Sequence, residues 1–133
     1  MASWSIVDSA IDHGLVTMDF LIVSIVHFTY LWIVHFTKSI TGKPIRLTDE
    51  RWVHIVEGHP EMAGYLNDVL LAVDNPSWVV EGGDTELLAL MYMRPDKLLV
   101  VVYKEESNDG FIITSFFTSK IESLLNRKIV WQK

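Results

Sequence analysis

The feature that most constrains this chain is an uncharged segment of eighteen residues between Asp19 and Lys38. Residues 1–37 contain no lysine or arginine, whereas all 11 basic residues of the 133-residue chain lie in residues 38–133. As a helix, the uncharged segment would be about 27 Å long, which is close to the hydrocarbon thickness of a bilayer. The sequence therefore divides into a hydrophobic N-terminal extension, residues 1–37, and a domain of ordinary polarity, residues 38–133.

Residues 20–37 fit three alternatives. One is a membrane anchor, in which case Lys38, Lys43 and Arg46 would hold the following domain in the cytoplasm under the positive-inside rule. The second is a hydrophobic helix or strand pair packed against the domain, which the many β-branched residues favour. The third is an upstream extension of a domain that begins near Thr37. A cleaved signal peptide is disfavoured, because no positively charged region precedes the apolar run.

Composition excludes several classes of protein. The chain is 50% hydrophobic and has no cysteine, so it is neither a disordered chain nor a disulfide or cysteine–zinc scaffold. The formal charge is −6, and residues 38–133 carry 11 basic and 14 acidic residues, the opposite of a nonspecific nucleic-acid binder. The motifs G-x-G-x-x-G and H-E-x-x-H are absent, and His27 and His35 alone make a weak metal signal. We therefore expect no cofactor and no metal.

The pattern of residues 38–133 predicts an α+β fold, with two N-terminal helices, then an antiparallel sheet of three or four strands with one short late helix. Thr48 suits the N-cap of a first helix that ends at Gly58, and Pro60 suits the first turn of a second helix. A short extended piece at 45–47 precedes the helices, strands are expected at 78–81, 87–93, 98–104 and 111–117, and a late helix at about 119–126 precedes an edge strand at 129–131.

The corner between the two predicted helices gathers the most reactive side chains. An imidazole titrates near neutral pH, so His59 is suited to general acid or base chemistry, with Glu61 orienting its ring. The alternative is that His59 and Glu61 cap the second helix. His54 lies five positions earlier, about 140° around an ideal helix, which favours a partly buried position beside Trp52.

A second group of candidates lies on the last long strand and the residues after it. Thr114, Ser115, Thr118 and Ser119 carry hydroxyl groups, which are ordinary on strands, and the last two also suit the start of the late helix. Lys104, at the end of an apolar strand, is either a solvated charge or a phosphate ligand.

These segments together resemble a family of bacterial and phage-associated domains assigned to the barnase–EndoU–colicin–RelE superfamily of ribonuclease folds. The pattern W-x-H-I-x-x-x-H-P-E at 52–61 is the distinctive part of the resemblance, which covers residues 38–133. The family implies N-terminal helices followed by a four-stranded antiparallel sheet, and metal-independent cleavage of RNA. The matching segments are LTDERWVHIVEGHPEM at 47–62, LLVVVYK at 98–104, GFIITSFFTSKI at 110–121 and IVWQK at 129–133.

The resemblance also implies roles for individual residues. The helical histidine of the family falls on His59, and the strand pattern Thr-Ala-Tyr-x-Thr reads here as TSFFT at 114–118. Phe116 therefore replaces an aromatic hydroxyl of the family pattern, and this departure implies a slower or inactive enzyme if that hydroxyl contacts phosphate or transfers a proton. The expected catalytic residues are His54, His59, Glu61, Lys104, Thr114 and Thr118, and the expected substrate-binding residues are Ser115, Ser119 and Lys120.

The resulting expectation is a toxin-like, metal-independent endoribonuclease in which a ribose 2′-hydroxyl attacks the adjacent phosphodiester. His59 would be the general base or acid, and Lys104 with the two threonines would stabilise the negative charge of the phosphorane. The expected partners are an RNA substrate and an antitoxin or immunity protein, and the domain is expected in the cytoplasm. One alternative is a catalytically degenerate module of the same fold that binds RNA or protein. Another is a membrane-tethered regulatory domain, which rests on residues 20–37.

The membrane alternative has a direct test. If residues 20–37 anchor the chain, a tagged full-length chain will sediment with the membrane fraction and will resist extraction with carbonate, because an inserted apolar helix is not released by high pH. A wholly soluble full-length chain would exclude the anchor.

Overall fold

The apolar run at 98–104 forms a strand that is buried on both faces. In the computed structural model, which describes residues 33–133, this strand is β5 (Lys97–Glu105). Successive side chains of a strand point to opposite faces. Its buried residues accordingly divide between two hydrophobic clusters, with Leu98 and Val100 in one and Leu99, Val101 and Tyr103 in the other.

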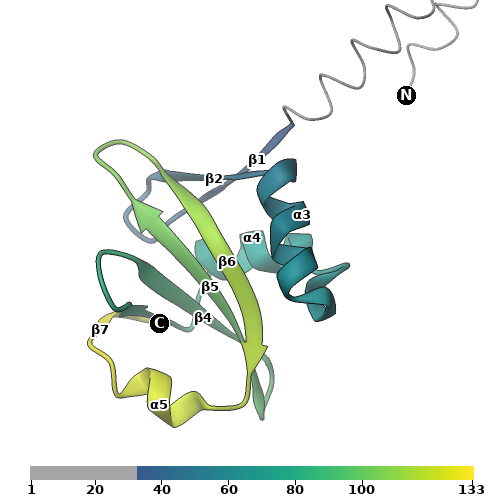
Figure 1. Ribbon diagram of the computed structural model, residues 1–133. Coiled ribbons are helices and arrows are strands. Elements are labelled where there is room, and N and C mark those ends of the chain that lie inside the picture. The colour runs from purple at the N-terminus through teal and green to yellow at the C-terminus, as the bar shows by residue number, and fades with distance from the viewer. Residues whose placement is uncertain (1–32) are drawn as a thin grey trace, which may run out of the picture. The chain divides into compact units, whose positions relative to one another are not determined.

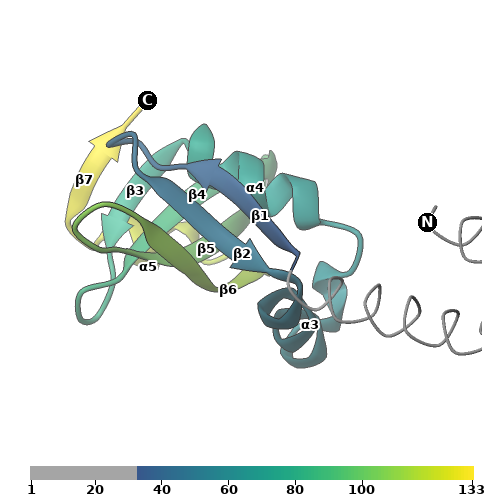
Figure 2. The ribbon, with the colours of Figure 1, turned by 90° about the horizontal axis from the view of Figure 1, so that it is seen from above.

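The strand β5 lies inside a seven-stranded mixed sheet with the order β1-β2-β6-β5-β4-β3-β7 (Figures 1 and 2). Neighbouring strands are antiparallel except β2 and β6, which are parallel and pair only at Ile45 with Gly110 and at Arg46 with Phe111. The other strands are β1 (Val34–Lys38), β2 (Pro44–Thr48), β3 (Trp78–Glu81), β4 (Leu87–Arg94), β6 (Gly110–Thr118) and β7 (Ile129–Gln132).

Helices cover both faces of the sheet. Between β2 and β3 the chain forms α3 (Asp49–Gly58), the 3₁₀ turn η1 (Pro60–Met62) and α4 (Leu66–Asp74). Their buried side chains join the larger cluster, together with Tyr103 of β5. On the other face, α5 (Ile121–Leu125) packs against the smaller cluster. A strand with two buried faces needs this arrangement, because each face must be covered by another element.

The predicted fold class is wrong. Two strands, β1 and β2, precede the helices, so the helices are inserted into the sheet sequence rather than placed before it. The sheet has seven strands and is mixed rather than antiparallel with three or four strands. The physical reason is that β2 joins β6 through a pairing between segments far apart in the chain, which local sequence patterns do not report.

Most individual elements match their predictions, with two differences. The strand predicted at 78–81 is confirmed as β3, and the edge strand at 129–131 is confirmed as β7, which pairs with β3. The second predicted helix is divided, because Gly64 adopts a φ of 88° after η1 and α4 begins only afterwards. At α5 no side chain caps the first turn; instead the Thr118 hydroxyl accepts a hydrogen bond from the Lys120 backbone N–H.

The strand β1 includes residues 34–37, which the sequence assigned to the N-terminal extension. His35 Nε2 lies 2.8 Å from Asp49 Oδ1 at the start of α3, and the Thr37 hydroxyl donates a hydrogen bond of 2.7 Å to the Leu70 carbonyl of α4. These residues therefore belong to the sheet. The remaining residues of the candidate anchor, 20–32, lie outside the described residues, as does His27. No helix within residues 33–133 is long and apolar enough to cross a membrane.

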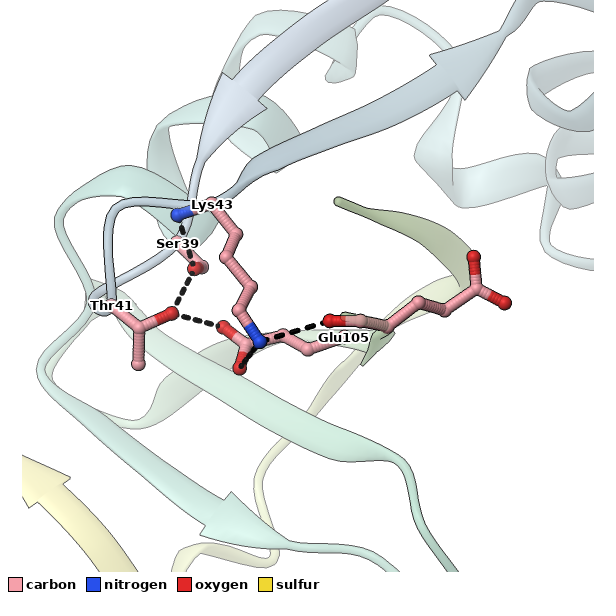
Figure 3. A network of polar contacts seen from close by, with 5 residues as sticks. Ser39, Thr41, Lys43 and Glu105 are labelled. Atoms are coloured by element: carbon pink, nitrogen blue, oxygen red, sulfur yellow. Dashed lines mark hydrogen bonds and ion pairs between the residues drawn. The ribbon is translucent and has the colours of Figure 1, made fainter. Parts of the chain in front are cut away.

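A chain of hydrogen bonds connects the β1–β2 turn to the end of β5 (Figure 3). The Thr41 hydroxyl donates to Glu105 Oε2 at 2.7 Å and lies 2.9 Å from the Ser39 hydroxyl. Since Thr41 has one hydroxyl hydrogen, Ser39 must be the donor in the second bond. Ser39 in turn accepts from the Lys43 N–H at 3.3 Å, and Lys43 Nζ bonds the Glu106 carbonyl at 2.9 Å. The turn is thus held against the sheet by groups that polarise one another.

Tyr103 provides a test of this core. Its side chain has no solvent exposure, its hydroxyl has no hydrogen-bond partner in the described part of the chain, and burial together with the charge of Glu105 raises its pKa. We expect Tyr103→Phe to raise the free energy of unfolding by about 1 kcal/mol at neutral pH, because it removes an unpaired buried hydroxyl. The measurement is urea denaturation of the two proteins across a pH series.

The stability difference between the wild type and Tyr103→Phe should depend on pH. A raised pKa in the folded state means that the wild type loses stability once the pH exceeds the unfolded value of about 10. The advantage of the phenylalanine variant should therefore grow above that pH. A variant that is less stable than the wild type at neutral pH would contradict this description of the core.

Candidate functional site

The candidate site lies along the edge of β6 that no strand covers. β6 pairs with β5 over its length but with β2 only at its first two residues. The connection from α3 to α4 follows the remaining edge. In it, the His59 ring centre lies 5.8 Å from that of Phe116, and the Tyr65 ring meets Phe117 edge-on at 5.0 Å. Phe116 and Phe117 point to opposite faces, so this connection contacts both faces of β6.

His59 is held in place by its backbone. Its N–H donates to the Ile55 carbonyl at 2.7 Å, and its carbonyl accepts from the Met62 N–H at 2.8 Å. The ring is 39% exposed, and its Nδ1 lies 3.5 Å from Glu61 Oε2. His59 occupies the N-cap position of η1, as the capping alternative expects, but its side chain makes no capping hydrogen bond. With Nδ1 facing a carboxylate, Nε2 is the ring nitrogen left for a substrate.

A hollow of about 420 Å³ is lined by Glu61, the partner of His59, but not by His59 itself. Glu61 forms part of its wall, and Lys97, at the start of β5, places its Nζ 5.3 Å from the Phe117 ring centre. The Thr118 hydroxyl accepts from the Lys120 N–H, so its own hydrogen is still available to donate. The residues that line the hollow are Glu61, Tyr65, Lys97, Phe117, Thr118 and Ser119.

This set of groups suits an anionic substrate. An imidazole beside a carboxylate can transfer protons at neutral pH, and an ammonium group and a hydroxyl can stabilise charge on a phosphoryl or acyl oxygen. Within residues 33–133 no group of three or more His, Asp or Glu side chains is arranged to hold a metal ion. The side chains gathered here are of the types used in acid–base catalysis with electrostatic stabilisation.

The structure brings together about half of the residues that the sequence singled out. His59 and Glu61 meet at the corner, and Thr118 and Ser119 line the same hollow as Glu61. Lys120 follows at the start of α5 and lines an adjoining hollow of about 590 Å³ that also includes Ser119.

Lys104 and Thr114 lie elsewhere on the sheet. Lys104 pairs with Phe111 near the β5–β6 turn, whereas Thr118 pairs with Leu98 at the other end of β5. Six residues separate these two positions, so Lys104 lies about 20 Å from Thr118 along the strand. Thr114 pairs with Val102 and lies on the same face of the sheet as Lys104.

The remaining two candidates are not in the site. His54 is 65% exposed and lies 3.7 Å from Glu57 one turn along α3, so the partly buried position expected for it is wrong. Ser115 has no solvent exposure, and its hydroxyl has no partner among the described residues. It pairs with Val101, whose side chain joins the cluster beneath α3 and α4, and is therefore closed off from a substrate.

Sequence reasoning missed Tyr65 and Lys97. The sequence pattern places Tyr65 on the apolar face of a helix and Lys97 in a turn. The position of Lys97 could have been found by counting strand pairs back from the Asn108–Asp109 turn, since this register brings the start of β5 to the end of β6. No comparable signal marked Tyr65, because its position depends on the division of the second helix at Gly64.

Comparisons with known proteins add no relative to this description. No family model matches the chain, no curated protein matches it, and no solved structure matches it.

Proposed function

We propose that the protein is a metal-independent endoribonuclease whose active site is the hollow beside His59. The observation that carries the proposal is the contact of His59 with Glu61 at the edge of a hollow that also contains Lys97 and Thr118. Phosphodiester cleavage by an adjacent hydroxyl needs a proton acceptor and charge stabilisation rather than an activated water, and these side chains are of the matching types.

The reaction begins with the ribose 2′-hydroxyl. His59 Nε2 accepts its proton while the 2′-oxygen forms a bond to phosphorus, and Glu61 stabilises the resulting imidazolium through Nδ1. The bond between phosphorus and the 5′-oxygen then breaks. The products are a 2′,3′-cyclic phosphate and a 5′-hydroxyl, so no water or cofactor is consumed in this step.

Two side chains are proposed to stabilise the negative charge of the phosphorane. Lys97 takes the role that the sequence gave to Lys104, because it lines the same hollow as Glu61. The Thr118 hydroxyl can donate its hydrogen to a phosphoryl oxygen while its lone pair accepts from the Lys120 N–H. Donors fixed before the reaction are effective because they need little reorganisation when the charge develops.

Tyr65 is proposed to donate a proton to the leaving group. Phe116 lacks the aromatic hydroxyl that the resembling family carries at this position of the strand pattern. Tyr65 supplies a phenol to the same hollow from a different element, and its contact with Phe117 orients the ring. In the proposed mechanism this hydroxyl protonates the 5′-oxygen as it leaves.

The first test compares two histidines. Full-length wild type, His59→Ala and His54→Ala are incubated with total RNA in EDTA, and the new RNA ends are mapped. We expect the wild type to produce cyclic phosphate ends and His59→Ala to cleave about 10²–10⁴-fold more slowly, because it lacks the general base. His54→Ala, whose ring is exposed and does not line the hollow, should cleave like the wild type.

The proposal fails if the folded wild type and His59→Ala are both inactive on all RNAs supplied. That result would favour the alternative of an RNA- or protein-binding module without catalysis. Equal losses in the two histidine variants would also contradict it, because they would show that the hollow is not the active site. The full-length chain is needed, because a chain that begins at residue 38 lacks most of β1.

The second test concerns Lys97. Lys97→Met retains a long apolar side chain against Phe117 but removes the ammonium group. At saturating RNA we expect the rate to fall about 10²–10³-fold, since the transition state no longer has this charge-stabilising donor. Lys128→Met, which changes an exposed lysine, is the matched control. A normal rate for Lys97→Met would remove this residue from the mechanism.

A further inference from the structure

One face of β6 continues from the proposed active site to the opposite end of the strand. Thr118, Phe116, Thr114 and Phe111 pair in turn with Leu98, Val100, Val102 and Lys104, which are alternate residues of β5 and so share one face. A bulge that inserts Ile113 keeps Phe111 on this face although it lies three residues before Thr114. Aromatic and hydroxyl side chains therefore alternate along about 20 Å of this face. All four are partly exposed, and Phe116 also packs against the cluster that α5 covers.

A second hollow lies at the far end of this face. It has a volume of about 170 Å³ and is lined by Arg46, Thr48, Arg51, Phe111 and Ile112. The Arg46 guanidinium carbon lies 5.4 Å from the Phe111 ring centre, and its Nη1 contacts Asp109 Oδ2 at 2.8 Å. The carboxylate thus holds a planar cation over an aromatic ring, which extends the flat surface that a base can stack on.

The charges near this hollow differ from those of the chain as a whole. Arg46, Arg51 and Lys104 lie close to Phe111, because Arg46 and Lys104 are its register partners and Arg51 shares its hollow. Among the ion pairs of residues 33–133, Arg46 has Asp109 as its partner, while Arg51 and Lys104 are in none. Two cations are therefore available to a ligand in a chain of formal charge −6.

We infer that this hollow and the face of β6 that leads from it form a binding track for single-stranded RNA. In this arrangement Arg51 and Lys104 bind backbone phosphates, a base stacks on Phe111 and Arg46, and the strand continues past Thr114 to Phe116 and the His59 hollow. The inference rests on the proposed function, because it assigns the substrate of the same site. It also gives Lys104 a role in substrate binding.

Single-stranded RNA is the ligand that this chemistry fits. Proteins that bind single strands combine cations that follow the backbone with aromatic rings on which bases stack. A duplex keeps its bases paired and stacked on one another, so none would be free to stack on Phe111. The small number of cations agrees with local recognition rather than with nonspecific attraction by net charge.

The test measures binding separately from cleavage. The probe is a fluorescein-labelled single-stranded RNA of about twelve nucleotides, made with 2′-O-methyl riboses, which lack the attacking hydroxyl. Fluorescence anisotropy at several salt concentrations gives the affinity of full-length wild type, Arg51→Gln with Lys104→Gln, Phe111→Leu and Lys128→Gln. The Arg51 side chain can be changed safely, since it is the Arg51 backbone N–H that bonds the Thr48 cap.

We expect the double variant to bind more weakly, with a slope of log affinity against log salt that is smaller by about 0.7 for each phosphate that the variant no longer neutralises. Phe111→Leu should bind about tenfold more weakly with little change in slope, because it removes stacking rather than charge. Lys128→Gln, which changes an exposed lysine outside the track, should bind like the wild type. Melting curves for each variant establish that it is folded.

Three outcomes would overturn the inference: no binding of the probe by the wild type, wild-type affinity in the double variant and in Phe111→Leu, or an equal loss in Lys128→Gln. Tighter binding of the matching duplex would overturn the assignment to single strands. Because the probe cannot be cleaved, binding by the track in a protein that does not cut natural RNA would reject the proposed function and keep the track. Cleavage by the wild type together with normal probe binding by the track variants would reject the track and keep the proposed function.

Discussion

The burial of β5 on both faces is the constraint on which the rest of the structure depends. Five of its side chains have no solvent exposure, and they alternate between two hydrophobic clusters. Each cluster needs its own cover, so α3 and α4 lie on one face and α5 on the other. The strand also needs a partner on each side, which β4 and β6 provide. The position of β6, and with it the candidate site, follows from this requirement.

The site exists because β6 is only partly covered on its outer side. β2 pairs with its first two residues, and beyond them the connection that contains His59 and Tyr65 occupies the edge. This connection is short and tightly bonded, with Gly64 in a left-handed conformation and the His59 backbone bonded on both sides. A rigid connection of this kind holds an imidazole and a phenol against one strand, which a flexible loop would not do.

The positions of individual cations matter more for anion binding by this protein than its total charge does. The chain is acidic, with a formal charge of −6, yet Lys97 stands at one end of β5 and Lys104, near Arg46 and Arg51, at the other. The two lysines are seven residues apart, about 23 Å along β5, and their side chains leave opposite faces of the sheet. The proposed track for single-stranded RNA therefore meets the proposed catalytic hollow at Thr118, which lines the hollow and lies on the same face as Lys104.

The sequence by itself determined the local elements, because caps, breaks and periodicity act over a few residues: Thr48 starts α3, Gly58 ends it, and the run at 98–104 is a buried strand. It also placed His59 beside Glu61, since two residues at one corner remain neighbours in any fold. Only the tertiary structure decided that β1 and β2 join the sheet, that Lys97 rather than Lys104 lines the hollow, and that Tyr65 completes it. These placements depend on the register of β5 with β6 and on the parallel contact of β2 with β6, which are pairings between distant segments that no local pattern encodes.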